Sequence, residues 1–584
     1  MAAGAERMLV GEAEAPLVRV PERRRVPWAG LALAVGVGAL LAVHLDAPGF
    51  FDNEGRYAEV AREMLLSGDW VTPRLDFTLF LNKPPLVYWL TALVFRVAGP
   101  TEWARLVSLG AAAVTLVATS RLGALLYGEA AGLLGGLALA TCLGFVLEAR
   151  TLRPDMLVTA AVVVALLCWM RAADVRARRG CWLAGLYAAL GVGVLAKGLV
   201  PIAVVGVPLV ATQLRAHGWR ALRDLRPGLG LAVMAAIVLP WHVLVAARHP
   251  GFAWDYVVNQ HLLFFLDRKL PRDSEGDSLG FFWTAFVGRA LPWSLLLPLT
   301  LAEAAHGLRR DSGPAARATL FLWTWMGGLL LLFSCAPSRL EHYSIPALPA
   351  AALLAARAWQ RARAGEVGRT AWVSLAVTGT TVAATGLAGV LAGRSYLART
   401  YWIAQVPGLL ALVPPAATVL AMAGVLAAFA AARRRPGVLV GTLAAVAVSF
   451  AVIVVRAEVA AEPFFSWRPL ARALEAAVPA DTEVVFEAPE EYQLVGGLAY
   501  YTRRRVTLLE PPGFVAPAYL AGRTDEVFLS RANFAQRWQA GEPLAFVSDP
   551  QRRREEPAGL VPGPFHLVGR FGDRWLVTRR PAAR

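Results

Sequence analysis

The sequence predicts a mainly α-helical, polytopic membrane protein with a C-terminal extramembrane α/β domain. Of its 584 residues, 57% are hydrophobic and only 17% are charged, whereas soluble domains carry about 25% charged residues. Apolar runs near the length needed to cross a bilayer recur up to residue 457. Beyond that point the chain is polar, charged and rich in Pro and Gly. We therefore expect a transmembrane domain at 1–457 and a separate domain at 458–584.

The transmembrane domain is predicted to hold about thirteen helices. The first apolar run follows three consecutive arginines and lacks a small-residue cleavage site, so we expect a signal anchor that is retained as a span. The predicted spans are 27–45, 103–121, 129–147, 156–172, 181–196, 199–213, 228–247, 281–303, 316–335, 343–360, 371–393, 403–432 and 437–456.

The distribution of arginine sets the predicted topology. Arginine-rich segments between spans lie on the cytoplasmic side by the positive-inside rule. All of them can lie there only if residues 46–102 stay wholly outside, so the moderately apolar stretch 84–98 is predicted to be a helix at the outer surface and not a span. The loop 248–280 and the chain after 457 then also lie outside. The arginine-rich segments are 23–25, 173–179, 215–226, 308–317, 361–369 and 433–435.

The outer C-terminal domain shows strand and helix patterns. Alternating apolar and polar residues predict strands at Glu483–Glu487, Val506–Leu509 and Ala545–Ser548, and a hairpin at Phe565–Thr578 that turns at Gly572–Asp573. Helices are expected at Pro469–Val478 and Tyr492–Thr502.

Composition also excludes several function classes. The net charge of +16 is explained by arginine in the inward loops, and no basic stripe with interleaved aromatic residues indicates nucleic-acid binding. The four cysteines lie within or beside apolar runs without CxxC spacing, so we expect no metal cluster.

The first outer segment begins with a predicted amphipathic helix at 50–70. Its apolar residues recur at helical spacing from Tyr57 to Leu65, and Gly68 is a stop signal, so the pattern predicts a helix at the membrane interface. Asp52, Asn53, Glu54 and Arg56 crowd its start. Asp52 or Asn53 could simply cap the helix, or these charges could form part of a site.

Lysine is rare and confined to the outer side. Lys and Arg total 58, yet only Lys83, Lys197 and Lys269 are lysines, and all three fall on predicted outward segments. A lysine ammonium is a compact point charge that suits phosphate. Chance placement in loops is the alternative explanation.

Other outward loops carry further polar groups. A lone histidine in such a loop is more often a hydrogen-bonded residue than a ligand or base, but several loops bearing such groups could line one polar cavity at the outer membrane surface. The residues are Arg153 and Asp155, then His261, Asp267 and Arg268, and finally Arg339, Glu341, His342 and Tyr343.

These motifs resemble the polytopic GT-C glycosyltransferases that use polyprenyl-phosphate sugars. The likeness is greatest to the bacterial lipid A aminoarabinose transferases and the related family-39 protein mannosyltransferases. It is carried by FDNEGRYAEVAREML with NKPP downstream, RPDM, LAKG, the NQH loop and HYSIPALPA, in matching order over the first ~350 residues.

The resemblance implies an enzyme of the bacterial inner membrane whose active site and C-terminal domain are periplasmic. Such an enzyme transfers a sugar, with inversion, from a polyprenyl-phosphate donor to lipid A or another cell-envelope acceptor, and no cofactor is expected. A protein O-mannosyltransferase-like enzyme and a transporter or flippase of lipid-linked saccharides are the alternatives.

The resemblance also implies roles for residues. Asp52 would accept a proton or stabilise the sugar cation, while Glu54 and Asp155 would orient sugar hydroxyls or Lys83. The donor phosphate would contact Arg56, Lys83, Arg268 and Lys269. The sugar or acceptor pocket would be lined by Tyr57, Arg153, Lys197, His261, His342 and Tyr343.

Two positions depart from the family pattern. The residue before Lys83 is often Glu in the aminoarabinose transferases, able to reach a metal together with the loop histidine, but here it is Asn82. Amide oxygen is a poorer ligand, so we predict no tightly bound metal although His261 is present. Phe264 and Phe265 stand where an Arg-Phe pair often follows that histidine, so the sequence leaves one phosphate partner, the sugar and the acceptor open.

Overall fold

The structure is a computed structural model that describes residues 29–271, 276–309, 312–487, 492–511, 515–548, 559 and 561–580. The apolar run that is predicted to be a retained signal anchor is described from residue 29 as α1 (Ala29–Ala42), and the arginines at 23–25 lie outside the described residues. Most described residues are helical, and a small sheet lies at the end of the chain.

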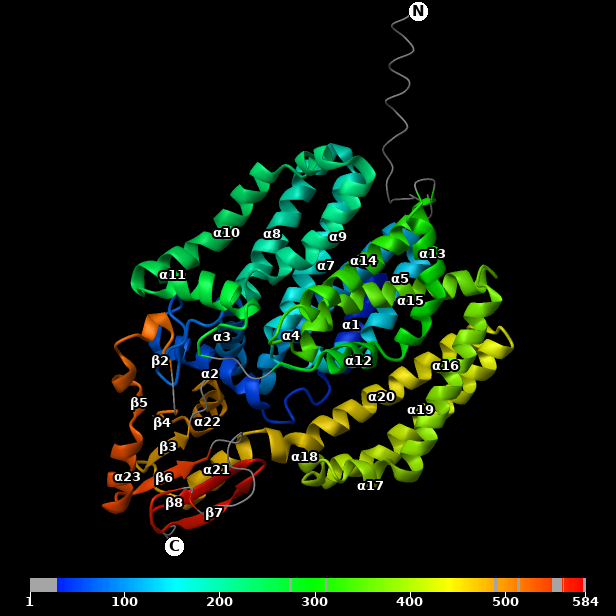
Figure 1. Cartoon of the computed structure of the whole chain (residues 1–584). Helices are drawn as coiled ribbons and strands as arrows, with labels where there is room; N and C mark the ends of the chain where they lie inside the picture. Colours follow the sequence, from blue (N-terminus) through cyan, green and yellow to red (C-terminus); the bar gives the residue numbers. More distant parts are fainter. Residues whose placement is uncertain are drawn as a thin grey trace, which may run out of the picture.

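Long helices form the membrane part of the molecule (Figure 1). Eight helices are long and apolar enough to cross a membrane, or up to ten if each of two bent helix pairs forms one span, among the described residues. Thirteen spans remain a prediction. The principal helices are α4 (Leu106–Tyr127), α7 (Pro154–Asp174), α8 (Arg179–Lys197), α9 (Val200–His217), α10 (Pro227–Arg248), α14 (Pro314–Ser334), α15 (Leu348–Arg363), α16 (Arg369–Ala388), α19 (Pro407–Ala432) and α20 (Pro436–Phe465).

Two of the predicted spans are bent. The run 129–147 folds as α5 (Glu129–Ala140) and α6 (Leu143–Ala149), at 67° to each other. The run 281–303 folds as α12 (Leu279–Arg289), η5 (Trp293–Thr300) and α13 (Leu301–Gly307), with a bend of 101°. Pro292 lies at the second break and has no N–H to continue a helical ladder.

The shorter elements connect these helices. η1 (Glu102–Arg105) precedes α4, η2 (Arg176–Arg178) precedes α8, and η3 (Trp219–Leu225) precedes α10. After α10 come α11 (Phe252–Trp254) and the π-helical η4 (Asp255–Leu263). η6 (Glu341–Ala347) leads into α15, and η7 (Gly389–Gly393), α17 (Arg394–Leu397) and α18 (Tyr401–Ala404) lie between α16 and α19.

The first outer segment holds α2 (Asp52–Ser67), the short hairpin β1 (Arg74–Leu75) and β2 (Thr78–Leu79), and α3 (Leu86–Ala98). α3 has only 13 residues, fewer than the roughly 20 needed to span a bilayer. This agrees with the expectation that 84–98 is not a span. α2 ends where the sequence predicts, because Gly68 takes a left-handed φ of 68° at its C-cap.

Both faces of α2 are buried by protein, so neither face is open to lipid or solvent, and its place at a membrane interface remains a prediction. The apolar residue Val60 and the charged residue Glu59 are each 0% exposed. α22 (Val495–Thr502) of the C-terminal segment covers the polar face. A Cβ added at Gly55 would lie 2.5 Å from the Gly497 Cα atom, so the absence of side chains lets the two helices touch.

The C-terminal sheet packs beside the first outer segment at one end of the molecule (Figure 1). Its strand order is β5-β4-β3-β6-β8-β7, with β5, β4, β3 and β6 parallel and β8 and β7 antiparallel to their neighbours. The strands are β3 (Glu483–Glu487), β4 (Thr507–Leu509), β5 (Phe528–Leu529), β6 (Leu544–Val547), β7 (His566–Phe571) and β8 (Arg574–Thr578).

The predicted strands and helices of this domain match the structure closely, but some elements were missed. The predicted helices appear as α21 (Arg468–Ala477) and as η8 (Tyr492–Leu494) with α22. β5, α23 (Arg531–Gln539), η9 (Ala518–Leu520) and η10 (Thr524–Glu526) were not predicted. The predicted domain boundary at 457 falls inside α20, which continues to Phe465 because Glu458 and Phe464 pack against the rest of the chain.

Candidate active site

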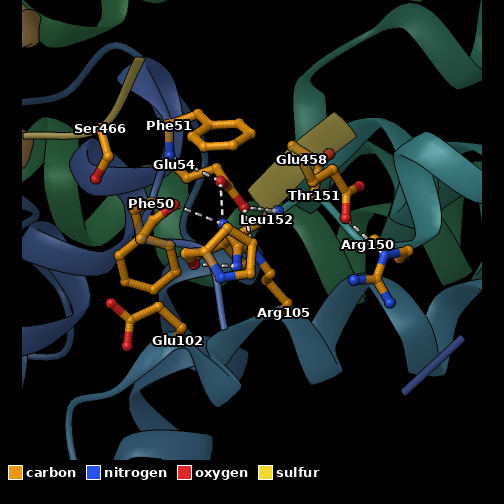
Figure 2. A network of polar contacts seen from close by, with 12 residues as sticks. Phe50, Phe51, Glu54, Glu102, Arg105, Arg150, Thr151, Leu152, Glu458 and Ser466 are labelled. Atoms are coloured by element: carbon orange, nitrogen blue, oxygen red, sulfur yellow. Dashed lines mark hydrogen bonds and ion pairs between the residues drawn. The ribbon is translucent and has the colours of Figure 1, made fainter. Parts of the chain in front are cut away.

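A buried ion pair fixes the start of α2 (Figure 2). Glu54 accepts hydrogen bonds from Arg105 Nε at 2.8 Å and Nη2 at 2.7 Å, and from the Leu152 backbone N–H at 2.7 Å. Burial alone would raise the pKa of Glu54, but the Arg105 guanidinium and these hydrogen bonds hold it below its ordinary value. Glu54 therefore joins α2 to α4 and to the segment that leads into Arg153 and Asp155.

Glu54 also caps its own helix. The N-cap residue is Phe51, and Glu54 Oε2 accepts a hydrogen bond from the Phe51 N–H at 3.0 Å. The alternative in which Asp52 or Asn53 supplies the cap is therefore wrong. Both oxygens of Glu54 accept hydrogen bonds from protein donors, and its role toward sugar hydroxyls or Lys83 remains a prediction. The Asp52 side chain lies outside the described part of the structure.

Asp155 and Lys197 meet where α7 begins and α8 ends. Lys197 Nζ donates to Asp155 Oδ1 at 2.5 Å, and the same nitrogen lies 4.4 Å from the centroid of the Tyr343 ring on η6. Pro154 at the first position of α7 fixes the backbone there. Lys197 therefore contacts two other predicted site residues, which come from two further segments of the chain.

Arg153, Glu341 and His342 extend this cluster. Arg153 Nη1 lies 3.9 Å from Glu148 Oε2, and Arg289 Nη2 donates to Glu341 Oε1 at 2.8 Å. Despite its burial, the pKa of Glu341 is held well below its ordinary value by His342 and Arg289. Burial lowers the pKa of His342, although Asp155 and Glu341 oppose this, so His342 is expected to be neutral at pH 7.

His261 joins η4 to the same cluster. Its Nδ1 lies 2.6 Å from the Tyr256 carbonyl oxygen, and its Nε2 lies 3.3 Å from the backbone nitrogen of Leu199. Gly198, next to Lys197, has a φ of 77°, and a Cβ there would lie 2.6 Å from His261 Nε2. Only glycine fits this approach without strain. Burial, assisted by the nearby Lys83 charge, lowers the pKa of His261.

The remaining two lysines lie near Asp255, also on η4. Asp255 Oδ1 accepts a hydrogen bond from Asn259 Nδ2 at 2.8 Å. Burial raises the pKa of Asp255, while the positive charges of Lys269 and Lys83 lower it. Lys83 thus lies near both His261 and Asp255, and the structure brings all three lysines to one region.

The other predicted phosphate ligands are placed differently. Arg56 contacts Gln493 of the C-terminal segment, and its Nη2 donates to Tyr57 OH at 3.1 Å. The Tyr57 ring lies 6.0 Å from the Tyr88 ring. Arg56 therefore links α2 to the C-terminal domain. Arg268 is exposed on the loop after η4.

Several polar groups of this region were not predicted. Arg105, Glu148, Tyr256, Asp255 and Arg289 take part in the network, and the signal available for them was a charged or polar residue inside or beside an apolar run. Gln493 carried no such signal.

Four buried polar atoms here have no hydrogen-bond partner among the described residues. They are Asn82 Oδ1, Tyr88 OH, Glu148 Oε1 and Tyr256 OH, and such atoms are few in folded proteins. Within the described residues no group of three or more His, Cys, Asp or Glu side chains could hold a metal ion.

Comparison with known proteins identifies relatives of this chain. A family model for dolichyl-phosphate-mannose-protein mannosyltransferases matches residues 82–243. The undecaprenyl phosphate-α-4-amino-4-deoxy-L-arabinose arabinosyl transferase of Pseudomonas paraeruginosa is 32% identical over 391 residues, 64% of this chain and 66% of that protein. Its counterpart in an Enterobacter species is 29% identical over 346 residues, 56% of this chain and 58% of that protein. The chain is related to the aminoarabinose transferases. The matches span between about half and two thirds of the curated relatives' length.

Solved structures share the fold over nearly the whole chain. ArnT from Cupriavidus metallidurans, bound to undecaprenyl phosphate, superposes with a TM-score of 0.75 at 24% identity and covers 95% of this chain and 98% of its own. An archaeal oligosaccharyltransferase from Archaeoglobus fulgidus, in complex with an inhibitory peptide and a dolichol phosphate, gives a TM-score of 0.51 at 12% identity, with 89% of this chain and 69% of its own covered. The predicted GT-C fold with a C-terminal α/β unit is confirmed.

Proposed function

We propose that this chain is an inverting glycosyltransferase. It moves a sugar from a polyprenyl-phosphate donor to a lipid A-type or other cell-envelope acceptor on the periplasmic side of the inner membrane. The observation that carries the proposal is the convergence of Lys83, Lys197 and Lys269 with Asp155 and His261 in one partly buried region. This is an unusual concentration of cations for the edge of a membrane domain, and it suits an anionic substrate.

The chemistry follows from the leaving group. When the glycosidic bond breaks, the polyprenyl phosphate keeps the bonding electron pair and gains negative charge, and the sugar carbon becomes positively charged. Cations stabilise this transition state more than the ground state, which lowers the barrier. Lys83 and Lys269 are the cations that we assign to the phosphate, with Arg268 on the same loop. Asp52 is the assigned base or stabilising carboxylate.

Lys197 and Asp155 have a different role. Because they pair with each other at 2.5 Å, their charges largely cancel, and they hold the start of α7 to the end of α8 beside Tyr343. His261 and His342 have lowered pKa values. They are therefore neutral at pH 7. Both ring nitrogens of His261 contact backbone atoms, so His261 holds η4 against the Gly198–Leu199 turn. His342 and Tyr57 are assigned to the sugar hydroxyls, and Glu54 and Arg56 hold α2 in place.

An apolar groove supports a lipid-linked donor. A cavity of about 900 Å³ lies between α3, α4, α7 and α8, and its wall includes Leu90 and Val97 of α3 and Leu157 of α7. α3 begins three residues after Lys83. A polyprenyl chain in this groove would place its phosphate near Lys83.

The test is sugar transfer in proteoliposomes that contain a polyprenyl-phosphate sugar and lipid A. Replacing Lys83 with Met should lower kcat/KM by at least 100-fold, which corresponds to about 2.7 kcal/mol of lost transition-state stabilisation. The control is R96M, since Arg96 is exposed on α3. Activity of K83M equal to that of R96M would contradict the proposal.

The mannosyltransferase model at 82–243 favours a second candidate with the same chemistry and another substrate pair. The same assay with a polyprenyl-phosphate mannose donor and a protein acceptor distinguishes the two. Transfer to protein and not to lipid A would select the O-mannosyltransferase-like enzyme.

A further inference from the structure

A second cavity lies outside the candidate active site, beside α16. Its volume is about 790 Å³. One wall is a single face of α16 from Arg369 to Ala384, the end of α19 supplies Ala431 and Ala432, and the turn after α19 supplies Arg434. Both arginines belong to the arginine-rich segments that the charge distribution places on the cytoplasmic side.

The groove is long and apolar. The lining residues of α16 run from Arg369 to Ala384, and the fifteen steps of about 1.5 Å between them cover about 22 Å of helix. Thr380 and Thr381 donate their hydroxyl hydrogens back to the carbonyls of Ala376 and Val377, each at 3.0 Å, so they present mainly their methyl groups. Val377 is 61% exposed. The groove therefore offers an alkyl chain a continuous apolar surface.

The two arginines lie together at one end of this groove. Half of the hydrocarbon core is about 15 Å thick, so a strip of about 22 Å that starts in the core reaches the level of the lipid headgroups. Arg434 has a left-handed φ of 51°, in the turn that ends α19, where the Arg435 N–H donates to the Ala430 carbonyl at 2.8 Å. This turn places Arg434 at the same end of the groove as Arg369.

We propose that this groove binds an anionic phospholipid. One acyl chain lies along α16, and Arg369 and Arg434 hold the phosphate-bearing headgroup. Basic pockets between membrane helices on the cytoplasmic side bind anionic headgroups in this way. Charge complementarity favours an anionic phospholipid over the alternatives. A lipid without net negative charge, or the apolar surface of a partner helix, would gain less from two arginines. The site is independent of the proposed transfer reaction.

The experiment measures lipid binding to the full-length protein. The purified protein is titrated with phosphatidylglycerol or phosphatidylcholine in detergent, and bound lipid is counted by native mass spectrometry. Phosphatidylglycerol should bind more tightly. Loss of one arginine should weaken it about fivefold, and the double variant R369Q/R434Q should weaken it about thirtyfold.

A matched control comes from the same turn. Arg433 stacks on Phe429, 5.3 Å from the ring centroid to the guanidinium carbon, and does not line the groove, so R433Q should leave binding unchanged. V377W should fill the groove and weaken lipid binding, and both variants should keep the unfolding temperature of the parent.

Three results would overturn the proposal: equal affinity for the two lipids, unchanged phosphatidylglycerol binding in R369Q/R434Q, or the same loss in R433Q. Inorganic phosphate is the further probe. If it displaces the lipid at micromolar concentration and V377W has no effect, the arginines form a simple anion site and the acyl-chain groove is refuted.

Discussion

Replacing Arg105 with Met would leave the Glu54 carboxylate buried without its counter-charge. The side chains of Glu54 and Arg105 are 2% and 3% exposed, so water cannot replace the lost partner. Arg105 also donates to the backbone carbonyls of Leu45, Pro48 and Gly49 at 2.9, 2.7 and 3.0 Å. Breaking a buried pair by removing one partner costs about 3–5 kcal/mol, and we expect R105M to fall at the upper end because three carbonyls also lose their donor.

The assay is chemical unfolding in detergent micelles, followed by tryptophan fluorescence. R96M is the control, since it removes an exposed arginine from α3 and should change the free energy of unfolding by less than about 0.5 kcal/mol. The double variant E54Q/R105M removes both charges and should recover part of the stability that R105M loses. The coupling energy in this cycle should be about 1–3 kcal/mol.

The pH dependence of stability gives the reasoning a second test. Because the pKa of Glu54 is lowered in the folded protein, Glu54 contributes stability that is present above its unfolded pKa and is lost as the pH falls through its folded pKa. In R105M the largest opposition to burial is gone and only the Leu152 and Phe51 N–H groups still lower the pKa of Glu54, so this pKa should rise and acidification from pH 7 to 5 should stabilise the variant. The account would be refuted if the free energy of unfolding of R105M fell by less than about 1 kcal/mol. It would also be refuted if the stability of R105M changed with pH in the same direction as that of the parent.

Three further predictions concern Asp76, Gly198 and Lys197. Asp76 accepts a hydrogen bond from the Val506 N–H at 2.9 Å, and burial raises the pKa of Asp76 to about 8. The folded state therefore binds the proton more tightly than the unfolded state, and stability should fall as the pH rises from about 4 to about 8. Thermal unfolding of D76N should lack this pH dependence, and an unchanged slope of unfolding temperature against pH in D76N would contradict the prediction. G198A should lower transfer activity 10- to 100-fold, because its Cβ would displace His261, and an active G198A would exclude the proposed place of His261. K197M should leave Asp155 unpaired and raise the KM for the donor, while retention of wild-type kinetics would show that their ion pair does not shape the pocket.

The sequence predicted local structure well where pattern alone determines it. β3 begins and ends at the predicted residues, and Gly68 ends α2 as expected. Alternation of apolar side chains and the conformational freedom of glycine act within a few residues, so both can be read from the chain.

The contacts that build the site could not be predicted in the same way. Glu54 and Arg105 are 51 positions apart, and neither residue type indicates its partner. The polar face of α2 looked solvated or interfacial because nothing in the sequence shows that Gly55 meets Gly497. Rare lysines on outward segments did indicate a common region, because charge placement across a membrane is constrained by topology.

The most direct test of the central claim is the sidedness of four engineered cysteines, each introduced alone into a cysteine-free background. Positions 69, 268 and 503 lie on the first outer segment, the loop after η4 and the C-terminal domain, and position 363 lies at the end of α15. A membrane-impermeant maleimide applied to spheroplasts should label the first three and spare the fourth until the membrane is opened. If any of the first three is protected together with 363, the lysines and the C-terminal domain do not share one side, and the proposed active site cannot form.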